Sequence, residues 1–219
     1  MKKTLIVAAA ALISASAFAQ TTVSSANIVG YVKVATTNGL QIVSAQFDST
    51  NNTPTGLFGD TLPLGSTIYK YDPVTGYGGN ISEYQTIFLS GDAWSAELDL
   101  SDGAFWVETT TVNTNIIAGD VNMANSVTNN IMPGLNLMEY PYPVSVSIND
   151  LDITPALGDT IYKYDPETGY GGQIAEYQTI FLAGDAWSTV LTFEVGEGFW
   201  YENAAATTNV WVEARPFTN

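Results

Sequence analysis

The sequence predicts an all-β protein built from two tandem antiparallel β-sandwich domains of immunoglobulin-like architecture. The first observation is a repeat, because residues 64–95 return ninety-three positions later as residues 157–188 with five of thirty-two positions changed. The second is a series of short segments, rich in β-branched and aromatic residues, separated by Gly, Pro and Asn at sandwich-like spacing. The third is that no window of eleven or more residues after the N-terminal leader carries a helical stripe. We therefore expect an internal duplication, with domains at 20–120 and 121–219.

The N-terminus reads as an export signal over residues 1–19. Lys2 and Lys3 precede an apolar run, and Ala17-Phe18-Ala19 forms a small-residue cleavage site before Gln20. Export predicts a secreted protein in the medium, at the cell surface or in the periplasm. The apolar run is shorter than the roughly 20 residues of a membrane span, and no later segment is longer, so we expect no membrane insertion.

The predicted strands follow the same order in both domains. In the first domain, strands are expected at 27–34, 39–44, 68–71, 83–89 and 103–108. In the second domain, residues 134–139 match 39–44, and residues 197–202 match 103–108. Segments 115–123 and 209–213 resemble 27–34, and we expect 115–123 to lead from one domain into the next. Alternation places Tyr69 and Tyr71 on one face, the better candidate for the core, and Lys70 on the other.

The block centre, Asp72-Pro73-Val74-Thr75-Gly76, has the composition of a hairpin turn. Asp accepts local backbone hydrogen bonds, Pro presets φ and Gly tolerates a positive φ. We therefore interpret this motif as structural.

Charge and composition exclude several functions. The formal charge is −16 with no His and no Cys, and loss of Lys2 and Lys3 with the signal makes it −18. Nucleic-acid binding needs several cations and is not expected. The absence of His and Cys removes Ser-His-Asp and Cys-His catalysis and ordinary zinc sites, so we expect a non-enzymatic protein with no catalytic residues.

Two chemistries remain open to acidic residues. A carboxylate pair drawn from Asp72, Glu83 and Asp92, or from their counterparts Asp165, Glu176 and Asp185, is the minimum for a glycosidase. Calcium binding by loop carboxylates and carbonyls is the other, although no D-x-D-x-D-G spacing occurs, and we expect no cofactor.

The residue order also resembles repeat modules of uncharacterised secreted proteins from Gram-negative environmental bacteria. The resemblance rests on Gly-Leu-x-Leu/Ile at 39–42 and 134–137, Ile-Tyr-Lys-Tyr-Asp at 68–72 and 161–165, the Thr-Gly-Tyr turn, Gly-Asp before Trp, and the closing Phe-Trp. It covers residues 27–212, and this chain has Leu40 and Leu135 where such modules often carry Trp. The resemblance implies extracellular β modules and no particular activity.

Aromatic residues within the blocks are candidate sugar-binding platforms, since a flat ring packs on a pyranose while nearby polar groups bind hydroxyls. The alternative is that these rings fill a core without disulfides. The candidate binding residues are Tyr77, Glu83, Tyr84, Gln85, Asp92 and Trp94, with Tyr170, Glu176, Tyr177, Gln178, Asp185 and Trp187 in the second block.

Polar positions within the blocks are also unchanged: Lys70, Glu83, Gln85 and Thr86 recur as Lys163, Glu176, Gln178 and Thr179. Either recent copying preserved them or their surface makes the same contact twice. We favour the second interpretation. It predicts a cell-surface structural or adhesive protein that forms homo-oligomers or filaments through the repeated surface. Bivalent glycan binding is the alternative and a glycosidase the third hypothesis.

Overall fold

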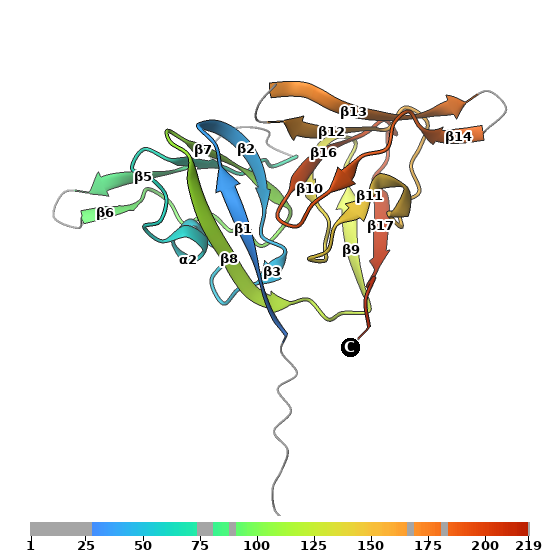
Figure 1. Cartoon of the computed structure of the whole chain (residues 1–219). Helices are drawn as coiled ribbons and strands as arrows, with labels where there is room; N and C mark the ends of the chain where they lie inside the picture. Colours follow the sequence, from blue (N-terminus) through green and yellow to red (C-terminus); the bar gives the residue numbers. More distant parts are fainter. Residues whose placement is uncertain (1–27, 74–80, 88–90, 166–168, 181–183, 219) are drawn as a thin grey trace, which may run out of the picture.

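The computed structural model describes residues 28–73, 81–87, 91–165, 169–180 and 184–218 (Figure 1). Most of these residues lie in β-strands that form several small antiparallel sheets, with one short α-helix. This confirms the all-β class. None of the described helices is long and apolar enough to span a membrane.

The largest sheet of the first half (residues 28–121) has five antiparallel strands in the order β2-β7-β4-β5-β6. These strands are β2 (Gly39–Ser44), β7 (Ala104–Thr109), β4 (Thr67–Tyr69), β5 (Ile81–Ile87) and β6 (Gly91–Trp94). Four consecutive residues of β7 are buried, so both faces of this strand are covered. Phe105 and Val107 point into one cluster and Trp106 into another, as the alternation predicts.

The second half (residues 126–218) contains a sheet with the corresponding order, β10-β16-β12-β13-β14. Its strands are β10 (Gly134–Glu139), β16 (Gly198–Asn203), β12 (Thr160–Asp165), β13 (Gly169–Ile180) and β14 (Gly184–Trp187). Registers correspond as well, because Tyr69 lies opposite Trp106 and Tyr162 lies opposite Trp200.

Smaller sheets cover one face of each five-stranded sheet. In the first half β8 (Asn113–Val121) pairs with β1 (Val29–Thr36) and β3 (Phe47–Asp48). In the second half β17 (Asn209–Ala214) pairs with β9 (Ser126–Ile131), and β11 (Val146–Ser147) with β15 (Thr192–Phe193). The segment expected to lead between domains is thus paired with β1 along its length, and a separate strand, β9, opens the second half.

The core of the first half is closed by the short helix α2 (Pro54–Phe58). Thr53 caps its N-terminus by accepting a hydrogen bond from the Gly56 N–H, and Pro54 starts the helix where no N–H is needed. The Phe58 ring then meets Phe105 edge-on at 6.1 Å between centroids. Ile68 is fully buried in this core.

The core of the second half includes a buried acidic side chain, that of Glu213. The turn η2 (Ile148–Asp150) buries Ile148 beside the rings of Phe193 and Phe199, which stack at 4.2 Å. The buried Glu213 carboxylate accepts hydrogen bonds from Trp211 Nε1 at 2.8 Å and the Tyr140 hydroxyl at 3.0 Å. These bonds satisfy a charged group that would otherwise be costly to bury.

The two halves join through a third apolar cluster, formed by the opposite faces of the five-stranded sheets. The contacts are reciprocal: Tyr71 packs edge-on against Trp200, and Tyr164 packs edge-on against Trp106, each at 4.8 Å between ring centroids. Tyr71 and Tyr164 occupy matching positions of the two blocks. The tyrosine face expected in the core therefore lies partly buried between the halves, and Ile68, on the opposite face of β4, enters the core of the first half.

A small residue is required where the halves approach most closely. A Cβ built on Gly198 would lie 2.2 Å from the Ala104 Cβ and 2.6 Å from Ile42 Cγ2. The halves are further linked by Gln46, whose amide donates to the Tyr140 carbonyl at 2.8 Å and accepts from the Gly196 N–H at 2.8 Å.

Candidate functional site

The two near-identical blocks form the outer parts of the two five-stranded sheets. Strands β4, β5 and β6 belong to the first block, and β12, β13 and β14 to the second. Because the halves pack through β2, β7, β10 and β16, strands β6 and β14 lie at the sheet edges away from this contact. Figure 1 shows the β5–β6 and β13–β14 hairpins projecting at opposite ends of the molecule.

The first block presents only part of its predicted site at the surface. Gln85 on β5 and Asp92 on β6 are exposed. Glu83 and Tyr84 lie on β5, where the register places Tyr84 opposite Trp94, and Tyr77 lies outside the described residues.

Trp94 is a core residue, which corrects its place among the candidate sugar platforms. Its side chain is 7% exposed and packs near Phe58 with 6.4 Å between ring centroids. Its indole N–H donates to the Gly59 carbonyl at 3.0 Å, so the polar edge of the ring is also held within the fold. A ring buried in this way has no open face for a pyranose.

The second block presents the matching surface. Glu176 and Gln178 on β13 and Asp185 on β14 are exposed, while Tyr170 and Tyr177 lie on β13. Trp187 is half-buried and meets Tyr201 edge-on at 6.5 Å. Glycan binding at the tyrosines stays a prediction.

The repeated lysines have a structural role inside the molecule. Lys70 Nζ donates to the Asp99 carbonyl, and Lys163 Nζ donates to the Thr192 carbonyl at 2.6 Å. Lys163 also forms an ion pair with Glu197 at 2.7 Å. Identity at these two positions is thus explained by the same backbone contact in each half, whereas the exposed Gln85 and Gln178 have no such explanation.

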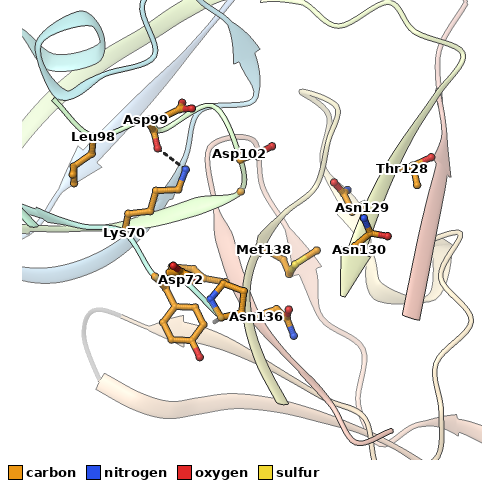
Figure 2. A pocket seen from close by; sticks show the side chains of 14 residues that line it. Lys70, Asp72, Leu98, Asp99, Asp102, Thr128, Asn129, Asn130, Asn136 and Met138 are labelled. Atoms are coloured by element: carbon orange, nitrogen blue, oxygen red, sulfur yellow. Dashed lines mark hydrogen bonds between the residues drawn. The ribbon is translucent and has the colours of Figure 1, made fainter. Parts of the chain in front are cut away.

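A pocket that the sequence analysis did not predict lies between the halves. We call it groove one; it encloses about 620 Å³ (Figure 2). Lys70, Asp99 and Asp102 lie on one side of the view and the β9 residues Thr128, Asn129 and Asn130 on the other. The complete lining is Lys70, Tyr71, Asp72, Pro73, Leu98, Asp99, Asp102, Gly103, Thr128, Asn129, Asn130, Asn136, Leu137 and Met138. Few of its polar members could be recognised in advance, because they come from segments distant in sequence.

A smaller side cavity of about 190 Å³ adjoins groove one and shares with it the lining residues Asp102, Gly103, Asn129 and Met138. The cavity is also lined by Asp48 and Glu139. Burial, reinforced by Asp102 and Asp48 and opposed by Lys70, raises the pKa of Glu139 to about 8. In the sequence, Glu139 is marked only by its place after the apolar residues Leu137 and Met138. The corresponding residue of the first half is Ser44.

A matching but smaller pocket, groove two, lies on the other side of the contact between halves. It encloses about 290 Å³ and is lined by Lys163, Tyr164 and Glu197 among others. Within the described part of the chain, no group of three or more acidic side chains is arranged to hold a metal ion. These residues therefore provide no ligand set for calcium.

Comparisons of the chain with family models, curated proteins and solved structures find no match.

Proposed function

We propose that this chain is a secreted, non-catalytic structural or adhesive protein of the cell surface. In this proposal it consists of two sandwich domains derived by duplication and assembles with other copies through its two outer ends. The supporting observation is that the exposed residues Gln85 and Asp92 at one end recur as Gln178 and Asp185 at the other.

Position explains why this repetition leads to assembly. Two like surfaces on opposite ends of one molecule cannot both engage a single partner copy, so contacts between ends generate open chains rather than closed dimers. Each end also finishes in a short edge strand, β6 or β14, and exposed strand edges are templates for pairing with another chain.

Charge sets the conditions under which such chains form. Contact between ends would bring Asp92 or Asp185 of one copy near the same residues of another, in a protein of formal charge −16. Like charges at close range oppose association and are screened by salt. We therefore expect calcium or high ionic strength to promote assembly.

The chain contains no Cys, so a single introduced thiol can block one end selectively. The test uses the mature chain with Gln85→Cys, Gln178→Cys or both, each coupled to maleimide–polyethylene glycol and examined by analytical ultracentrifugation and electron microscopy. Blocking one end should limit assembly to dimers, and blocking both should leave monomers. The same variants kept reduced and unlabelled are the matched controls and should assemble like the parent.

Two results would contradict the proposal. One is a parent chain that stays monomeric at high concentration with and without calcium. The other is a doubly labelled chain that still forms filaments.

A further inference from the structure

The two grooves between the halves occupy corresponding positions, but groove two is the smaller and is bordered by a loop of the second half, residues 194–197. In groove two, Val195 packs against the core of the first half. The Gly196 carbonyl accepts from the Ser44 N–H at 2.9 Å, and a bridge joins Val43 to Glu197. The Lys163–Glu197 ion pair lies beside this loop. These contacts fix the loop that borders groove two, which encloses about 290 Å³ against about 620 Å³ for groove one.

A difference in chain length leaves the other side open. The second half has one more residue between Trp187 and Trp200 than the first half has between Trp94 and Trp106. The shorter turn, with Asp102 and Gly103, borders both groove one and the side cavity.

A buried carboxyl in this cavity lacks part of its hydrogen bonding. This carboxyl belongs to Glu139. Its Oε2 atom is buried and has no hydrogen-bond partner among the described residues. A ligand that donates a hydrogen bond to this atom would replace the bond to water that it loses on burial.

The surrounding charges select a cation. Asp48 and Asp102 line the same cavity. Lys70, a base that lines groove one, donates an N–H of its ammonium group to the Asp99 carbonyl. These acidic side chains do not form a metal-holding group. An ammonium group on an organic ligand can instead donate to separate oxygens, since it has up to three N–H bonds.

We propose that groove one and its side cavity bind one small organic cation per chain, with its ammonium group against Glu139 and Asp102 and its remainder along Asn129 in the groove. A polyamine and an amino-sugar oligomer share this chemistry. A groove of about 620 Å³ is within the usual range for small-molecule sites. The site is independent of the outer ends.

Isothermal titration of the mature chain with spermidine and with a glucosamine trimer tests the proposal, with the N-acetylglucosamine trimer as the uncharged comparison. We expect saturable binding of at least one amine at one site per chain and no binding of the acetylated trimer. Binding of spermidine would identify a polyamine as the ligand class, and binding of the glucosamine trimer would identify an amino-sugar oligomer. Asp102→Asn and Glu139→Gln should each weaken binding about tenfold or more, since a hydrogen bond to a charged group contributes about 1.5–3 kcal/mol.

Asp60→Asn is the matched control, because it removes an exposed carboxylate that lines neither groove one nor the side cavity, and it should leave the affinity unchanged. Proton exchange gives a second readout. An ammonium group favours the ionised carboxylate, so binding at neutral pH should release protons when buffers of different ionisation enthalpy are compared. Failure of both amines to bind, binding at two sites per chain, or an equal loss in Asp60→Asn would overturn the proposal.

Discussion

Replacing the partly buried Glu139 with Gln should stabilise the protein at neutral pH and leave its stability unchanged in acid. The carboxyl lies between the halves, and its pKa rises from 4.5 to about 8 because it is buried beside Asp102 and Asp48, with Lys70 opposing the shift. Between these two pH values the folded chain keeps a proton that the unfolded chain releases. Rising pH therefore favours unfolding, until both states are ionised above about pH 8.

The magnitude follows from the pKa difference. Each pKa unit corresponds to about 1.36 kcal/mol, so keeping Glu139 protonated at pH 7 costs at most about 3 kcal/mol of folding free energy. Gln has a similar shape and does not titrate, so this cost disappears in the variant. We expect Glu139→Gln to raise the free energy of unfolding by about 1–3 kcal/mol at pH 7 and by close to zero at pH 4.

Urea unfolding followed by tryptophan fluorescence, at several pH values from 4 to 8.5, measures this difference directly. Glu176→Gln, on the exposed face of β13, is the control and should show no trend with pH. A stability difference between Glu139→Gln and the parent that is the same at pH 4 and pH 7.5 would refute the reasoning.

Two further substitutions test the packing of the halves and one difference between the blocks. Gly198→Ala should lower the free energy of unfolding by about 1–3 kcal/mol, because the added methyl would lie 2.2 Å from the Ala104 Cβ. Adding Ala104→Gly to this variant should restore part of the lost stability, as measured by thermal unfolding. Asp159→Ser should cost about 2–4 kcal/mol in urea unfolding, because the Tyr201 hydroxyl and the N–H groups of Ala156 and Ala204 lose their acceptor. A double-mutant cycle with Tyr201→Phe should show coupling of about 0.5–3 kcal/mol, and additivity would contradict the assigned hydrogen bond.

The Asp159 environment also explains one of the five differences between the blocks. Asp159 replaces Ser66, and its partner Tyr201 stands where the first half has Val107. The hydrogen bond exists only when both residues are present, so the substitutions form a matched pair. The sequence shows the two changes but not their contact, because they lie 42 positions apart.

Local chemistry was sufficient to predict the all-β class and many of the strands. Short apolar and β-branched runs bounded by Gly and polar residues, such as those of β1, β2 and β7, are typical of strands. β9 was missed because Ser126–Ile131 contains three consecutive polar residues, Thr128, Asn129 and Asn130, and is recognised as a strand only by its pairing with β17. The candidate site was less predictable still, since Trp94 carries the same local pattern whether its ring is buried or exposed.

What the sequence determined by itself is the repeat, the strand order along the chain and the identity of exposed residues such as Gln85 and Gln178 at both outer ends. Only the tertiary structure decided that Tyr71 and Tyr164 cross between the halves, and that the larger of the two grooves adjoins the cavity at Glu139. The physical reason is that these features depend on contacts between distant segments. A single additional residue before Trp200 changes how one loop packs without changing any local strand pattern.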